Sequence, residues 1–141
     1  MAKKSSFAKF AGPRFTELVE RSVSEAVAAL DADLKEGSPV DTGRFKASWF
    51  HAQSRSGIPD FDNAVPDPGD NKKVPAPPVL QADELDGLAN HVIINNLPYA
   101  TRLCEEGWSE KVDADWFKSI AQRWESGKYL DAAFRNNSTP D

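Results

Sequence analysis

The sequence predicts a mixed fold of helices and strands, the α+β class, within one small domain. Three patterns support this prediction: a long amphipathic stretch at 14–36, two strand-like runs at 45–53 and 88–96, and helical periodicity in the last third of the chain. A chain of 141 residues has the usual length of a single domain. Helices and strands are therefore expected to share one core.

The stretch 14–36 is the clearest helix in the sequence. Pro13 stands just before it, Gly37 can cap its end, and Pro39 prevents it from continuing. At 1.5 Å per residue it spans roughly 34 Å, so we expect it to lie across a sheet or against a neighbouring subunit. Its apolar stripe consists of Phe15, Leu18, Val19, Ser22, Val23, Ala26, Leu30 and Leu34.

Two segments are predicted as strands. Side chains alternate along 45–53, which is typical of a strand, although the start of this segment also fits a helical turn. The run 88–96 is centred on the β-branched residues Val92, Ile93 and Ile94, which favour a strand.

Three helical segments are predicted after the second strand. Residues 98–106 indicate a short helix in which Cys104 is a small buried hydrophobe. Residues 113–125 indicate a longer helix whose apolar face includes Trp116 and Trp124. The pattern continues beyond Gly127 with a shifted phase, so we expect a break there.

The composition divides the chain into a domain and its extensions. Residues 1–13 are predicted to be a flexible basic arm, 14–135 the α+β domain, and 136–141 a polar tail. The domain contains a Pro-rich insertion at 54–86, which is either a surface loop or an extended arm that lies on another subunit. Six of the ten prolines belong to it: Pro59, Pro66, Pro68, Pro75, Pro77 and Pro78.

Charge and cysteine content exclude several classes of function. The net charge of -5 argues against a protein that binds nucleic acid specifically, because such binding needs a basic face. The single cysteine, Cys104, cannot form an internal disulfide, so nothing indicates an oxidising compartment. No stretch is apolar enough for a signal peptide or a membrane span, so we expect no membrane partner and folding in a cytoplasm.

The triplet Asp-Thr-Gly at 41–43 matches the catalytic triplet of aspartic proteases. A helix and Pro39 precede it here, whereas the protease triplet follows an apolar strand. Arg44 follows it, and a bulky cation there would disturb the pairing of two aspartates. We therefore interpret Pro39, Asp41, Thr42 and Gly43 as structural turn residues.

No other pattern in the sequence indicates a reaction centre. His51 and His91 lie in the predicted strands, and neither stands at metal-ligand spacing from the other or from Cys104. There is no Gly-rich phosphate loop and no nucleophile elbow. The sequence therefore predicts a protein that is not an enzyme, with no cofactor, no metal and no catalytic residue.

The segment around the triplet resembles a group of phage proteins. Three blocks at 39–44, 95–100 and 105–109 follow the long helix in this order, and they are similar to the tail-component or tail-completion family of long-tailed bacteriophages. The resemblance covers about 14–52 and 88–111, and the Pro-rich insertion has no counterpart in it. The matching residues are Pro39, Val40, Asp41, Thr42, Gly43 and Arg44, then Asn95 or Asn96, Pro98, Tyr99 and Ala100, then Glu105, Gly107, Trp108 and Ser109.

The resemblance implies an architecture and a role. It implies a small antiparallel sheet with the long N-terminal helix and the C-terminal helices packed on it, and a ring of six copies at the head–tail junction or the top of the tail. DNA would pass through this ring without being bound specifically, and the neighbours would be other neck and tail proteins of the virion.

The candidate interface residues are Arg44, Tyr99, Glu105 and Trp108. Trp108 follows Gly107 in a predicted loop, and aromatic residues are enriched as anchors of interfaces. Two alternatives stay open: a tail terminator or head-closure subunit of the same neck, or a non-viral adaptor that binds a partner through the Pro-rich arm.

Overall fold

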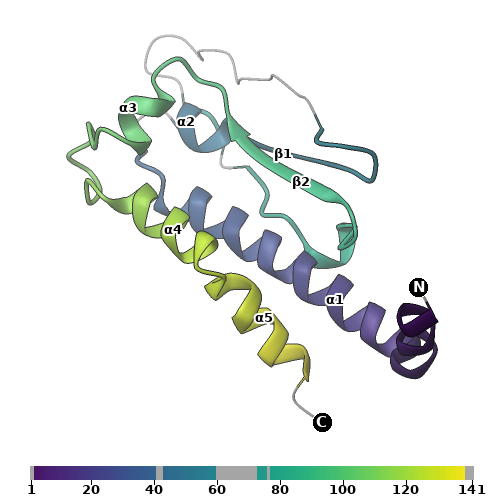
Figure 1. Ribbon diagram of the computed structural model, residues 1–141. Coiled ribbons are helices and arrows are strands. Elements are labelled where there is room, and N and C mark those ends of the chain that lie inside the picture. The colour runs from purple at the N-terminus through teal and green to yellow at the C-terminus, as the bar shows by residue number, and fades with distance from the viewer. Residues whose placement is uncertain (1, 41–42, 60–72, 76, 139–141) are drawn as a thin grey trace.

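The computed structural model describes residues 2–40, 43–59, 73–75 and 77–138, and for 2–13 it describes the backbone alone. Figure 1 shows the sheet on one side of the long helix and the two C-terminal helices on the other. The predicted α+β class, with its small antiparallel sheet, long N-terminal helix and C-terminal helices, is confirmed. The elements are α1 (Ala2–Gly37), α2 (Arg44–Ala47), β1 (Trp49–Ser54), the 3-10 turn η1 (Ala82–Glu84), β2 (Asn90–Asn95), α3 (Ala100–Cys104), α4 (Trp116–Glu125) and α5 (Lys128–Ser138).

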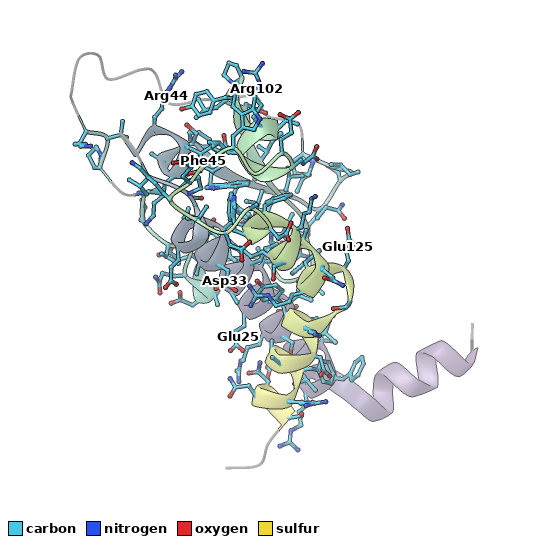
Figure 2. The ribbon with its side chains drawn as sticks, turned by 90° about the vertical axis from the view of Figure 1, so that its left-hand side faces the viewer. Glu25, Asp33, Arg44, Phe45, Arg102 and Glu125 are labelled. Atoms are coloured by element: carbon cyan, nitrogen blue, oxygen red, sulfur yellow. The ribbon has the colours of Figure 1, made fainter. Side chains whose placement is uncertain are left out.

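Helix α1 begins at Ala2, well before the predicted start at residue 14. Pro13 therefore lies inside the helix rather than ahead of it. A proline within a helix removes one backbone hydrogen bond and bends the axis. The purple N-terminal part of α1 indeed turns away from the rest of the helix (Figures 1 and 2). The flexibility of the basic arm stays a prediction.

The sheet consists of β1 and β2, which pair antiparallel from Trp49 opposite Asn95 to Ser54 opposite Asn90. The first strand is shorter than 45–53, because 44–47 form the helical turn α2 that the sequence left open. The second strand lies within the predicted run 88–96.

The C-terminal helices pack along α1. Gly127 has φ 77° and separates α4 from α5, so the predicted break is confirmed. The Tyr129 hydroxyl donates to Asp33 Oδ2 of α1 at 2.6 Å, and Asn137 Nδ2 donates to Glu25 Oε2 at 2.8 Å. Helix α5 therefore extends to Ser138, into the segment that the sequence predicted as a polar tail.

The core is aromatic and lies where α1, α2, α3, β1 and α4 meet. Trp49 and Trp116 are buried in it, as expected for residues that fill a core. Trp124, which the sequence placed on an apolar helix face, is partly exposed and packs on Tyr129 with ring centroids 6.1 Å apart.

Cys104 is buried, and burial together with the charge of Glu105 raises the pKa of its thiol to about 12. This agrees with its prediction as a buried hydrophobe.

The last part of the Pro-rich insertion lies against α1 of the same chain. Lys35 Nζ donates to the carbonyl oxygen of Pro78 at 2.8 Å. The N–H of Leu80 donates to Asp31 Oδ2 at 3.1 Å, and Ser24 Oγ donates to the carbonyl oxygen of Leu85 at 3.4 Å. Contact of the insertion with another subunit stays a prediction, and 60–72 lie outside the described residues.

Candidate functional site

One end of the molecule carries a groove of about 710 Å³ that three separate parts of the chain build. Residues within 39–45 supply one part of its lining, residues within 99–103 the second, and 109–111 the third. These parts belong to, or adjoin, the three blocks that resemble the phage family. Figure 2 shows Arg44, Phe45 and Arg102 gathered at this end, whereas Glu25 lies towards the other end. The fold thus brings the first motif block together with two later blocks that lie more than fifty residues further along the chain.

Gly43 shapes the turn that leads into the groove. Its φ of 90° is a left-handed conformation that glycine adopts without strain. A Cβ added at this position would lie 2.6 Å from the carbonyl oxygen of Val74. The third residue of the Asp-Thr-Gly triplet therefore has a structural reason to be glycine. Pro39 is buried at the exit from α1, whereas Asp41 and Thr42 lie outside the described residues, so their roles as turn residues stay predictions.

Gly43→Ala is expected to destabilise the protein more than Gly57→Ala does. Both glycines have positive φ, but a Cβ at Gly57 would meet nothing within 4 Å. Each substitution costs about 1–2 kcal/mol for the left-handed backbone, and only Gly43→Ala also forces Val74 to move. Urea unfolding of both variants measures the difference. Equal losses of stability would contradict a close approach of Val74.

Arg44 and Tyr99 meet at the groove. The Arg44 guanidinium lies 6.0 Å from the centroid of the Tyr99 ring, which is a cation–π distance. The Phe45 ring packs against the same tyrosine with centroids 6.5 Å apart. Asn95 Nδ2 donates to the carbonyl oxygen of Phe45 at 2.8 Å and fastens the end of β2 to α2. Two of the four candidate interface residues are therefore neighbours on a rigid base.

Trp108 is the most exposed tryptophan among the described residues, at 59%. The Arg102 guanidinium lies 4.3 Å from the centroid of its ring, and the backbone N–H of Trp108 donates to the carbonyl oxygen of Arg102 at 3.2 Å. Gly107, with φ 63°, makes the turn that sets the ring against α3. Glu105 ends α3 with an exposed side chain and is not among the residues that line the groove.

Sequence reasoning missed two residues of this end. Lys111 Nζ donates to the carbonyl oxygen of Val40 at 2.7 Å and so joins two sides of the groove. Arg102 holds the Trp108 ring by its guanidinium. A sequence pattern reports neighbours along one helix or strand, and neither contact lies within one element.

The groove is lined by charged and aromatic side chains of kinds that are common in binding surfaces. The groove offers the cations Arg44 and Lys111, the acid Glu110 and the phenol ring of Tyr99. Within the part of the chain that the structure describes, there is no group of three His, Cys, Asp or Glu side chains that could hold a metal ion. No helix in the same part is long and apolar enough to cross a membrane.

The groove is lined by Phe45 and Tyr99 among other residues, and Trp108 directly precedes Ser109 of its lining. Comparison of the chain with protein-family models, with curated proteins and with solved structures finds no match. A function can therefore be inferred from two observations, the sequence resemblance and the contacts at the groove.

Proposed function

We propose that the protein is a structural subunit of a phage virion, at the head–tail junction or the top of the tail. Its copies form a ring that completes or connects the tail and lets DNA pass. The observation that carries this proposal is the convergence of the three motif blocks on one surface: Gly43 and Arg44 from the first block, Tyr99 from the second and Ser109 from the third line one groove.

The composition of this surface supports a contact between proteins. The few residues that carry most of the binding energy of an interface are enriched in arginine, tyrosine and tryptophan. Arg44, Tyr99, Arg102 and Trp108 supply these side chains at one end of the molecule, in two cation–π pairs. Each aromatic ring thus has a cation beside it in the unbound subunit, and side chains positioned before binding lower its entropy cost.

The ring is tested by light scattering of the full chain after size exclusion. The expected mass is about six times the 15.5 kDa of one chain. The proposal would be wrong if two results were found together. The chain would stay monomeric up to its highest soluble concentration, and it would fail to join a tail assembly reconstituted with its neck neighbours.

Trp108→Ala is expected to dissociate the ring and leave the subunit folded. An exposed side chain contributes little to folding, whereas truncation of an interface anchor costs at least about 2 kcal/mol of association free energy. Light scattering and thermal unfolding measure the two effects separately. Ile58→Ala is the matched control, because Ile58 is 81% exposed and lies beyond the other end of β1. If Ile58→Ala weakened the ring as much as Trp108→Ala, the assignment of the surface would be wrong.

A further inference from the structure

The chain has two histidines, and they bond to each other across the sheet. His51 Nε2 on β1 and His91 Nδ1 on β2 are 2.8 Å apart, and the two rings stack with centroids 5.1 Å apart. In the strand register His51 lies opposite Ile93 and Gln53 lies opposite His91. The two imidazoles are therefore diagonal neighbours on one face of the sheet.

The partners of His91 fix the direction of this hydrogen bond. His91 Nε2 lies 2.8 Å from the backbone carbonyl oxygen of Asp86, and a carbonyl oxygen can only accept. His91 therefore donates from Nε2, so in its neutral form Nδ1 accepts a hydrogen bond from His51 Nε2–H. One chain of hydrogen bonds thus runs from His51 through His91 to the backbone at Asp86.

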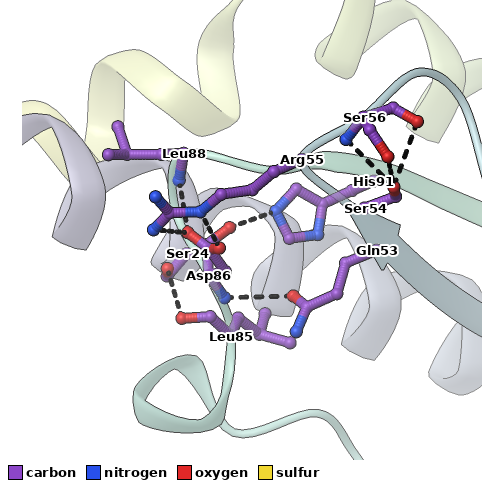
Figure 3. A network of polar contacts seen from close by, with 9 residues as sticks. All are labelled: Ser24, Gln53, Ser54, Arg55, Ser56, Leu85, Asp86, Leu88 and His91. Atoms are coloured by element: carbon purple, nitrogen blue, oxygen red, sulfur yellow. Dashed lines mark hydrogen bonds and ion pairs between the residues drawn. The ribbon is translucent and has the colours of Figure 1, made fainter.

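Asp86 belongs to the loop before β2, which forms hydrogen bonds to both the sheet and α1 (Figure 3). Its N–H donates to Gln53 Oε1 at 3.0 Å, and its carboxylate pairs with Arg55. The preceding carbonyl, of Leu85, accepts the bond from Ser24 of α1. Beside it, Gly87 lies so close to α1 that an added Cβ would clash with the Glu20 carbonyl oxygen. A shift at His91 would be transmitted to this loop.

We propose that the two histidines form a pH-sensitive latch that holds the loop 85–88 and the sheet on α1. One added proton can bind at His51 Nδ1, which leaves every hydrogen bond of the chain in place. A second proton must bind at His91 Nδ1, and that nitrogen then faces the N–H of His51 with no acceptor between them. Two stacked cations would also repel each other, so the second proton opens the latch.

The surroundings favour the closed form at neutral pH. Burial lowers the pKa of His51, the His91 ring and Lys35 lower it further, and Asp31 opposes them. Glu125 lines the same groove as His91, between β2 and α4. The charged groups around the pair are Asp31 and Lys35 on α1, Arg55 after β1, Asp86 before β2 and Glu125 on α4.

The sign of the effect follows from proton uptake. A histidine in an unfolded chain has a pKa of about 6.5, so at pH 5.5 the protonated form outnumbers the neutral form by about ten to one. If the folded pair excludes the second proton, the folding equilibrium constant falls at least about tenfold from pH 7.5 to pH 5.5, and the lowered pKa of His51 adds to this fall. The latch thus stabilises the fold above pH 6.5, and this contribution is lost as the pH falls.

Urea unfolding of the full chain at the two pH values tests the latch. His51→Gln should reduce the tenfold fall to less than threefold, because glutamine does not titrate and can turn either its N–H or its oxygen towards His91. Arg55→Gln is the control: it removes the exposed partner of Asp86 and should keep the tenfold fall. An equal fall in the wild type and His51→Gln overturns the proposal, as does a wild-type fall below twofold.

A nitrogen NMR titration of the wild-type histidines gives a second result that needs no variant. The latch predicts Nε2–H tautomers for both rings at pH 7.5 and two separate titration steps. Two independent single-step titrations near pH 6.5 would overturn it.

Discussion

Lys35→Met is expected to lower the free energy of unfolding by about 3–5 kcal/mol. Lys35 Nζ lies 2.8 Å from Asp31 Oδ2, and the two residues are only 5% and 1% exposed. The substitution removes the cation beside the buried Asp31 carboxylate. Among the described residues, the Leu80 N–H is then the remaining donor to Oδ2, and Oδ1 has no hydrogen-bond partner. It also frees the carbonyl oxygen of Pro78. The insertion should therefore become more sensitive to limited proteolysis around 77–80.

Arg135→Met is the matched control for this prediction. Arg135 and Asp131 form a pair with the same four-residue spacing on α5, but both side chains are largely exposed. An exposed pair of this kind contributes about 0.3–0.5 kcal/mol. Urea unfolding compares the two variants. If Lys35→Met lost no more stability than Arg135→Met, burial would not govern the strength of the Asp31–Lys35 pair.

The sequence predicted those elements that have a strong local pattern. These elements are the apolar stripe of α1, the β-branched run of β2 and the glycine between α4 and α5. Each can be recognised from a few neighbouring residues, by the spacing of apolar side chains or by a residue that interrupts a helix. The predicted start of α1 was wrong because a proline is compatible with both the first turn of a helix and a bend inside one. The Trp124 position shows a related limit, since periodicity gives the face of a helix and not what covers it.

The contacts that define the sites depend on segments far apart in the chain. In the sequence, Asp31 and Lys35 are two of the charged residues within the predicted helix 14–36, and contacts with the backbone at Pro78 and Leu80 complete their buried pair. His51 and His91 each read as a lone strand histidine, because their contact needs the strand register. The resemblance marked Arg44 and Tyr99 but not the two cations Arg102 and Lys111, whose partners the fold supplies.

Phe45→Ala is expected to cost about 3–5 kcal/mol of folding free energy, the usual loss for a buried phenylalanine. Phe45 is 4% exposed, and its ring lies edge-on to Trp49 and Trp116, with centroids 5.7 and 6.1 Å apart. Truncation leaves a cavity between α2, β1 and α4 and removes one support of Tyr99 at the groove. Since a small domain is stable by about 5–15 kcal/mol, the variant should be close to unfolding at 37 °C.

Phe134→Ala makes the same chemical change on the outer side of α5, where Phe134 is 36% exposed, and should cost less than half as much. Urea unfolding compares the two, with Phe45→Leu as a milder variant should Phe45→Ala not fold. Because Phe45 supports Tyr99, Phe45→Leu should also weaken the proposed ring, whereas Phe134→Ala should not. Similar losses of stability at the two positions would mean that the aromatic cluster around Phe45 does not organise the core. Loss of stability without any effect on the ring would separate the core from the groove and leave Trp108 as the anchor of the interface.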